Sequence, residues 1–303
     1  MREQGDVMRY LQAAALLPPH LRRRAQQVDK AYQAVAEELR LRAGRPMTVV
    51  CPQGERLVPD DEPVQAGDLN LVVEIATRAS AHTAMEQVRS GYFTVSGGHR
   101  IGICGSAVVK DGAIFNLRHL SSLAIRIARE VLGASASVAD KLWEGDTFQS
   151  TLILSPPGGG KTTLLRDLIR RLSNGTDHPA LRVGVADERG ELAAMYHGLP
   201  QFDVGRQTDV VDGCPKAAGL MMLLRGMNPQ VLAADEITAP EDCAALLLAA
   251  NCGVSLLCTA HAAGLDDLKT RPMYRPLLEN CCFKRLVVLT RRETGRDCQV
   301  TRL

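Results

Sequence analysis

One stretch near the middle of this 303-residue sequence constrains the fold more than any other, because a strand, a glycine-rich loop and a helix follow one another without interruption. The strand covers residues 151–154, and the helix carries its apolar residues on one face. Between them lies the loop Ser155-Pro156-Pro157-Gly158-Gly159-Gly160-Lys161-Thr162-Thr163. A strand, a glycine loop ending in Gly-Lys-Thr and a helix are the context that identifies a Walker A phosphate-binding loop, or P-loop.

The chemistry of this loop predicts a nucleoside triphosphate as ligand. Its glycines allow consecutive backbone N–H groups to converge on the β-phosphate, and the start of the helix adds about half a positive charge. Lys161 is predicted to bridge β- and γ-phosphate oxygens and Thr162 to ligate Mg²⁺, so ATP and Mg²⁺ are the expected cofactors. Ser155 stands where the consensus has glycine, which is the most tolerant position. A simple proline-glycine turn before a helix does not explain Gly-Lys-Thr at this place.

The second part of the sequence has the pattern of a buried parallel sheet. Four short apolar runs, at 152–154, 183–186, 231–234 and 254–258, are separated by helical stretches of about ten residues or more. This alternation predicts an α/β domain with a mainly parallel sheet, which we assign to residues 131–303. A closing hairpin, formed by 286–289 and 299–301, is expected to extend the sheet.

Residues 1–130 predict a smaller α+β domain. Ala31, Tyr32, Val35 and Leu39 recur at helical spacing and predict a helix that starts near residue 28. Further expected elements are a strand at 47–51, a helix at 83–90, a hairpin pairing 92–95 with 101–104, and a second hairpin within 108–115.

Acidic residues follow two of the predicted parallel strands. The strand at 231–234 ends in Asp235-Glu236, which is the pattern of a Walker B motif. Because ligands collect at the carboxyl ends of parallel strands, Asp235 is predicted to hold Mg²⁺ through water and Glu236 to orient the attacking water. The strand at 183–186 ends in a second acidic cluster, residues 187–191, in which Glu188 competes with Glu236 for that role. A solvated loop with local ion pairs is the alternative for the second cluster.

A histidine ends the fourth parallel strand. Thr259-Ala260-His261 follows the apolar run at 254–258 and places a hydroxyl and an imidazole at the same sheet edge. We predict that His261 senses the γ-phosphate. The alternative is a structural histidine that bonds a neighbouring carbonyl, which is the commoner use of a lone histidine.

Charge and composition argue against several classes of partner. Lys and Arg total 36 and Asp and Glu total 34, so the net charge of +2 does not point to nucleic acid or anionic lipid. Nine cysteines are an odd number in a chain too long to need disulfides, so we expect reduced thiols and a cytoplasmic location. Residues 243–260 carry no charge, but Asn251-Cys252-Gly253 divides them into a helix and a strand, so no membrane span is expected.

Several strings outside the P-loop carry a resemblance to a known family. They are residues 152–167, Thr208 to Lys216 (Thr-Asp-Val-Val-Asp-Gly-Cys-Pro-Lys), Asp235-Glu236-Ile237, Thr259-Ala260-His261, and, in the first domain, residues 40–46, 97–100 and 125–130. In combination these strings are specific and span nearly the whole chain. The sequence resembles the family of stage III sporulation protein AA.

The resemblance implies an ATPase similar to the motors of type II and type IV secretion, with an N-terminal domain preceding a RecA-like domain. It also implies a homo-hexamer at the cytoplasmic face of the mother-cell membrane, attached peripherally beneath channel proteins that join mother cell and forespore. In this comparison residues 187–191 resemble an acidic box and His261 a histidine box. Such ring motors often receive an arginine from a neighbouring subunit, for which Arg100, Arg118 and Arg126 are candidates.

Two other functions remain open at the level of sequence. A RecA-like motor that translocates DNA has the same core, but it predicts turnover stimulated by DNA and binding with a steep salt dependence. A scaffold that binds ATP to assemble but does not hydrolyse it needs no water-orienting carboxylate, so the presence of Glu188 and Glu236 argues against it. Trp143, the one tryptophan, stacks near an adenine or packs in the core.

Overall fold

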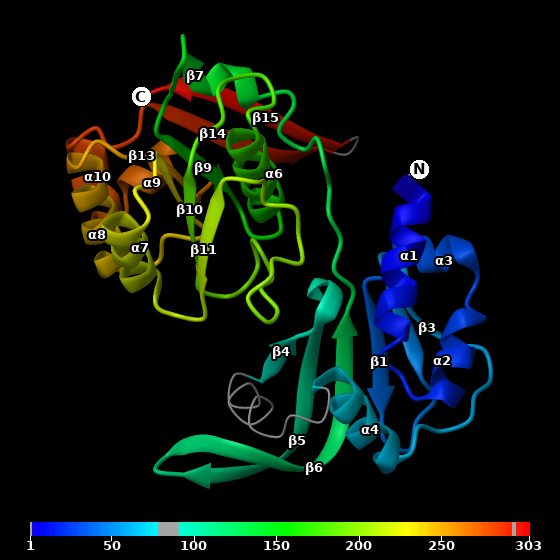
Figure 1. Ribbon diagram of the computed structural model, residues 1–303. Helices are drawn as coiled ribbons and strands as arrows, with labels where there is room; N and C mark the ends of the chain where they lie inside the picture. Colours follow the sequence, from blue (N-terminus) through cyan, green and yellow to red (C-terminus); the bar gives the residue numbers. More distant parts are fainter. Residues whose placement is uncertain (1, 78–90, 293–294) are drawn as a thin grey trace. The chain divides into compact units, whose positions relative to one another are not determined.

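A computed structural model describes residues 2–77, 91–292 and 295–303 of the chain (Figure 1). The chain divides into two compact units. Unit 1 contains residues 1–129 together with the short segment 195–201, and unit 2 contains residues 130–194 and 202–303. The helix expected at 83–90 lies outside the described residues.

Unit 1 is built on an antiparallel sheet of six strands in the order β3-β2-β1-β6-β5-β4. Its elements, in chain order, are α1 (Arg2–Ala14), α2 (Pro19–Gln26), α3 (Lys30–Val35), β1 (Glu38–Arg42), β2 (Thr48–Cys51), β3 (Gly54–Leu57), α4 (Ala66–Thr77), β4 (Tyr92–Thr94), β5 (Arg100–Lys110) and β6 (Ala113–Arg126). The two hairpins expected from the sequence are confirmed: β4 pairs with β5, and β5 pairs with β6 through the turn at Asp111-Gly112.

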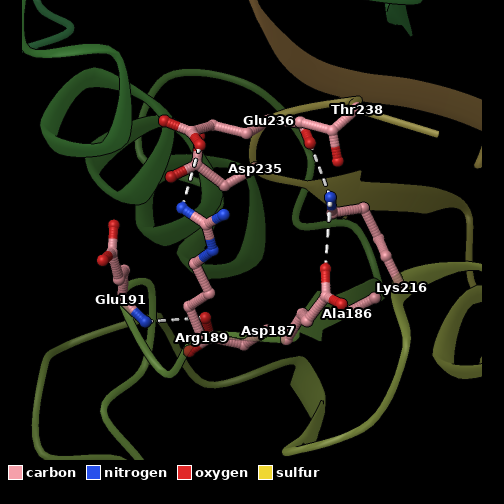
Figure 2. A pocket seen from close by; sticks show the side chains of 9 residues that line it. Ala186, Asp187, Arg189, Glu191, Lys216, Asp235, Glu236 and Thr238 are labelled. Atoms are coloured by element: carbon pink, nitrogen blue, oxygen red, sulfur yellow. Dashed lines mark hydrogen bonds and ion pairs between the residues drawn. The ribbon is translucent and has the colours of Figure 1, made fainter. Parts of the chain in front are cut away.

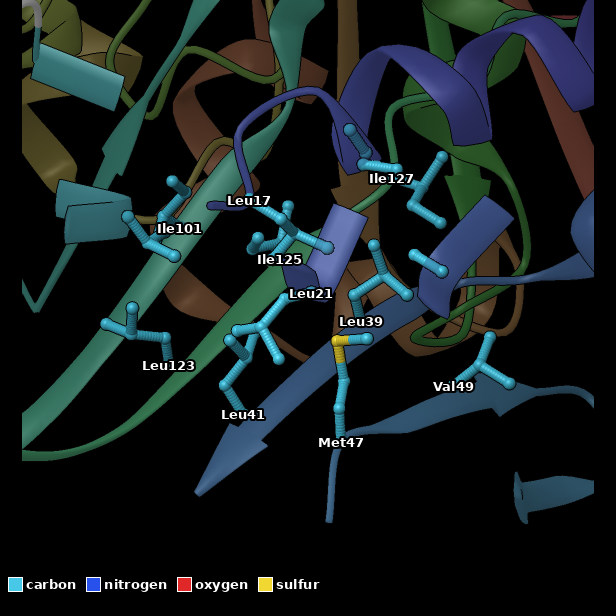
Figure 3. Packing of buried hydrophobic residues seen from close by; sticks show 14 of the residues in the cluster. Leu17, Leu21, Leu39, Leu41, Met47, Val49, Ile101, Leu123, Ile125 and Ile127 are labelled. Atoms are coloured by element: carbon cyan, nitrogen blue, oxygen red, sulfur yellow. The ribbon is translucent and has the colours of Figure 1, made fainter. Parts of the chain in front are cut away.

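One prediction for unit 1, the extent of its helix near Leu39, is wrong. The helix predicted to include Leu39 ends earlier, because α3 stops at Val35 and Leu39 lies in the strand β1. In β1, Leu39 and Leu41 are buried and alternate with half-exposed charged residues, which is the two-residue period of a strand. Figure 3 shows both leucines packed among aliphatic side chains of neighbouring elements, including Ile125 and Met47.

Unit 2 is an α/β unit with a seven-stranded sheet in the order β11-β10-β12-β13-β9-β14-β15. The strands of this sheet and the α-helices of unit 2 are, in chain order, β9 (Thr151–Ser155), α6 (Lys161–Asn174), β10 (Val183–Asp187), β11 (Thr208–Asp212), α7 (Lys216–Gly226), β12 (Val231–Ala234), α8 (Pro240–Asn251), β13 (Ser255–His261), α9 (Leu265–Lys269), α10 (Arg275–Glu279), β14 (Arg285–Arg292) and β15 (Gly295–Arg302). All neighbouring strands are parallel except β14 and β15, which form the expected closing hairpin.

Helices cover both faces of this sheet. Figure 1 shows α6 on one side of the strands and α7, α8 and α10 on the other. The central strands are buried on both faces, which explains why they are continuous apolar runs in the sequence. The uncharged stretch 243–260 forms most of α8 and most of β13, which agrees with the expected division into a helix and a strand. None of the described helices combines the length and the apolar character that crossing a bilayer requires.

Candidate active site

Four parallel strands bring the predicted site residues to one edge of the unit 2 sheet. The register pairs Ala186 of β10 with Ala234 of β12, and Ala234 with Cys258 of β13. It also pairs His261, the last residue of β13, with Ser155, the last residue of β9. The carboxyl ends of parallel strands form the edge where ligands bind in α/β sheets. The P-loop, both acidic clusters and the histidine therefore follow strands that end at this edge.

The glycines of the P-loop are required by its backbone. Gly158 and Gly160 have φ of +71° and +92°, in the left-handed region that glycine adopts without strain. At Gly159 a Cβ atom would lie 1.6 Å from the hydroxyl oxygen and 2.9 Å from the Cβ of Ser155, so a larger residue would require Ser155 to shift. Ser155 is itself buried, and its hydroxyl donates to the carbonyl of Pro156 at 2.9 Å. The loop is therefore tightly folded before α6 begins at Lys161.

A hydroxyl and a carboxylate from different elements meet at the start of α6. Thr162 Oγ1 donates to Asp235 Oδ2 at 2.6 Å, and the other oxygen of Asp235 accepts from the Thr259 hydroxyl. Burial raises the pKa of Asp235 above its usual range; the hydrogen bonds from the two hydroxyls only partly oppose this, and the negative charges of Glu236 and Glu191 add to it. Oxygen ligands of this kind suit Mg²⁺.

His261 connects Lys161 with Glu236. Lys161 Nζ lies 3.0 Å from His261 Nδ1, and His261 Nε2 lies 2.8 Å from Glu236 Oε1. An ammonium only donates and a carboxylate only accepts, so this geometry assigns the neutral tautomer that carries its proton on Nε2. Burial lowers the pKa of Lys161, and the carboxylates of Glu236 and Asp235 oppose that shift. The lysine is thus held next to the acidic pair by the imidazole.

A pocket opens beside this chain of contacts, and Figure 2 shows the side chains that line it. Arg189 points toward the Glu236 carboxylate, with its Nη1 3.3 Å from Oε2, and Lys216 enters from the other side. Glu188 and Glu236 both line this pocket. The two competing water-orienting carboxylates therefore share one space.

Within the acidic cluster, Asp187 has a structural task. Its carboxylate accepts the backbone N–H groups of Glu191, Leu192 and Ala193 at 2.8–3.1 Å, and the side chain is buried. These bonds fold the loop that follows β10. Glu188 is 43% exposed, and one of its oxygens lies 3.5 Å from Lys216 Nζ.

Two residues that line the pocket belong to no motif that predicts their place in the site. Lys216 and Arg189 appear in the sequence only as parts of longer strings, and no spacing rule points to their contacts with Glu236. The one available signal for Lys216 was its place directly after Pro215, where a helix starts.

The remaining candidates lie elsewhere. Trp143 stacks on His178 with ring centroids 4.2 Å apart and meets Phe148 edge-on. These contacts favour packing over stacking on an adenine. Arg126 pairs with Glu38 in unit 1, and Arg100 lies over the Tyr92 ring. A part for these arginines in a neighbouring subunit stays a prediction.

The donor set fits a nucleotide-bound Mg²⁺ better than a metal held by protein alone. Within the described ranges, no three or more His, Cys, Asp or Glu side chains are grouped to hold a metal ion. Mg²⁺ in phosphate-processing sites is bound by one or two protein oxygens together with substrate phosphates and water. Thr162 and Asp235 supply that number of oxygens.

Solved structures share this fold. The pilus retraction motor PilT, solved with bound ADP, aligns with a TM-score of 0.62 and 16% identity over 88% of this chain and 79% of that chain. The ATPase DotB of Legionella pneumophila aligns with a TM-score of 0.57 and 16% identity over 88% and 76% of the two chains. The chain therefore has an α/β fold of the RecA-like type, which it shares with these two ATPases.

Sequence comparison assigns the family. The family model described as sporulation stage III, protein AA, matches residues 8–300. Stage III sporulation protein AA of Bacillus subtilis (strain 168) is 37% identical over 285 residues, which are 92% of this chain and 90% of that protein. The chain belongs to the stage III sporulation protein AA family.

Proposed function

We propose that the chain is a Mg²⁺-dependent ATPase whose site is the P-loop edge of unit 2. The observation that carries the proposal is the linked set of contacts from Thr162 to Asp235 and from Lys161 through His261 to Glu236. These contacts bring together a phosphate-binding lysine, oxygen ligands for Mg²⁺ and a carboxylate able to orient water, which are the recurring parts of P-loop ATPases. The ADP bound to PilT supports the choice of an adenine nucleotide.

Each residue then has a defined task. The P-loop backbone, residues 155–163, cradles the phosphates, and Lys161 exchanges its contact with His261 for the β- and γ-phosphate oxygens. Thr162 would ligate Mg²⁺ and Asp235 would hold it through water, and the ion would neutralise charge on the phosphates. His261, released from Lys161, keeps its Nε2–H bond to Glu236, and its freed Nδ1 would have to gain a proton before it could donate to the γ-phosphate.

Glu236 is the better of the two candidates for orienting the attacking water. Its carboxylate joins His261 and Arg189, and the neighbouring Asp235 is the proposed metal ligand. Glu188 faces Lys216 and is more exposed, with 43% against 23% of the side chain accessible. A water held by Glu236 would therefore lie on the side of the phosphates, and Glu188 is left as a contributor to the charge of the pocket.

The biological role follows from family membership and is part of the proposal. A sporulation protein with the fold of secretion motors is suited to energise or assemble a channel between mother cell and forespore. We propose a homo-hexamer, attached peripherally at the cytoplasmic face of the mother-cell membrane to channel proteins. Nucleic acid is not the proposed partner, because the chain carries a net charge of only +2.

Two measurements on the purified chain test this proposal. Steady phosphate release from Mg-ATP is expected for the wild type and is expected to vanish in Lys161→Ala. The mass in solution, recorded with and without ATP, is expected to rise to that of a closed ring when nucleotide is present. Binding of ATP with a mass increase but no phosphate release would instead identify a nucleotide-gated scaffold, and stimulation of release by DNA would identify a DNA motor.

A further inference from the structure

Lys216 is a buried lysine to which no motif assigns a task. It begins α7, lines the pocket beside the P-loop edge, and only 5% of its side chain is exposed. Buried lysines are rare unless their charge is paired, because water must be stripped from the ammonium group. The partners of this ammonium therefore indicate what it does.

The ammonium of Lys216 meets oxygen atoms from three separate elements. It donates to the main-chain carbonyl of Glu236 at 2.6 Å and lies 3.5 Å from one carboxylate oxygen each of Glu188 and Asp242. Asp242 is also buried and accepts the backbone N–H groups of Thr238 and Ala239 at the start of α8. One hydrogen bond and two ion pairs of the ammonium thus join the turn after β12 to the start of α8 and to the loop that follows β10.

The turn that Lys216 grips has an unusual backbone. Glu236 has a φ of +50°, in the left-handed region that residues with a Cβ seldom adopt and that costs free energy. Its N–H donates to Thr259 Oγ1 at 2.8 Å, and its carbonyl accepts from Lys216. The peptide groups on both sides of the Glu236 Cα are thus held, which directs the side chain toward His261 and Arg189. Figure 2 shows the lysine pointing at this turn from the side opposite to the arginine.

We propose that Lys216 is a positioning residue for Glu236: by holding the Glu236 carbonyl it fixes the direction of the carboxylate that orients the attacking water. The inference rests on the proposed ATPase function. It requires that Lys216 controls the hydrolysis step and leaves nucleotide affinity unchanged, because the lysine does not lie in the P-loop. Simple charge balance for Glu188 and Asp242 is the competing explanation, and it does not involve the Glu236 carbonyl.

A double-mutant cycle separates these explanations. Lys216→Met keeps the length of the side chain and removes the ammonium. We measure kcat and KM for ATP for this change in the wild type and in the Glu236→Gln and Glu188→Gln backgrounds. Lys269→Met is the matched control, since that lysine is 59% exposed and pairs only with Asp266 among the ion pairs of the described residues.

The expected result is a fall in kcat of about tenfold or more for Lys216→Met with KM changed less than about threefold, as expected for residues that act as a unit. The same substitution should cause no further loss in Glu236→Gln and an undiminished loss in Glu188→Gln. An equal loss of kcat in all three backgrounds, or a change confined to KM, would overturn the inference. Lys269→Met should match the wild type.

Two further controls keep the test decisive. If Lys216→Met does not fold because Asp242 is left buried without its partner, the cycle is repeated with Asp242→Asn present throughout. Wild-type turnover together with unchanged kcat in Lys216→Met overturns the role of Lys216 alone. Absence of phosphate release by the wild type overturns the proposed function, and the inference with it.

Discussion

Glu236→Gln is the substitution for which the structure predicts the largest loss of turnover with little change in binding. Glutamine keeps an oxygen that can accept from His261 Nε2, which is 2.8 Å from Glu236 Oε1. Its amide nitrogen, however, faces Arg189 Nη1 across the present 3.3 Å contact, where two donors oppose each other. The variant therefore loses the negative charge and the orientation of the carboxylate while the size of the side chain is kept.

The expected fall in kcat for Glu236→Gln follows from its proposed role in orienting the attacking water. Losing a positioned group that orients or deprotonates the nucleophile costs about 10²–10⁴ in rate, or roughly 2.7–5.4 kcal/mol at 1.36 kcal/mol for each factor of ten. Glu188→Gln loses only a part-exposed contact with Lys216, and exposed ion pairs contribute about 0–1 kcal/mol, so its kcat should fall less than about fivefold.

Single-turnover and steady-state phosphate release with Mg-ATP measure both variants, and KM for ATP serves as the binding control. We expect KM to stay within about threefold of the wild type in each, since neither side chain belongs to the P-loop. A large loss in Glu188→Gln with near-normal turnover in Glu236→Gln would refute the assignment and make Glu188 the water-orienting carboxylate.

Three further predictions concern single positions. Burial raises the pKa of Asp235, because the ligand-free fold favours the protonated carboxyl. The contribution of this residue to the free energy of unfolding is therefore fully present below about pH 3.9 and is lost as the pH rises through the raised pKa. Asp235→Asn should therefore raise the Tm at pH 7.5 without nucleotide, and it should abolish the increase in Tm that Mg-ATP gives the wild type. An unchanged or lower Tm without nucleotide contradicts this. His261→Ala should lower kcat by about 10²-fold, the effect of removing one preorganised donor, with ATP binding kept in a filter assay; normal turnover would remove His261 from the mechanism. Gly159→Ala should abolish ATP binding, because its Cβ would meet Ser155 Oγ at 1.6 Å, and adding Ser155→Gly should restore part of it in the same assay; binding by the single variant equal to that of the wild type contradicts the loop geometry.

Much of unit 2 could be predicted from the sequence because its strands are buried on both faces. Continuous apolar runs mark such strands, and each is followed directly by its polar site residues. The prediction that Asp235 and His261 gather at one sheet edge needed only the rule that parallel strands end on the same side. In the structure Asp235 contacts Thr162 and His261 contacts Lys161, while the catalytic roles of these residues stay proposals.

The errors have physical causes as well. Leu39 fits a helical spacing with Val35, but pairing of β1 with β2 and β6 places it in a strand, and such long-range pairing leaves little trace in a short window of sequence. The acidic cluster 187–191 was expected to lie at the phosphate edge, and its sequence did not indicate that the oxygens of Asp187 accept three backbone N–H groups of the next loop. The contact of Lys216 with the Glu236 carbonyl joins residues 20 positions apart and depends on the left-handed turn, which no spacing rule indicates.

Nucleotide binding at the P-loop is tested by equilibrium titration of the purified chain with Mg-ATP, with Lys161→Ala beside the wild type. We expect one nucleotide per chain for the wild type and for Glu236→Gln, and at least about a hundredfold weaker binding for Lys161→Ala, which removes a buried cation from the phosphates. Binding by Lys161→Ala that equals the wild type would contradict the claim that the loop from Ser155 to Thr163 holds the triphosphate.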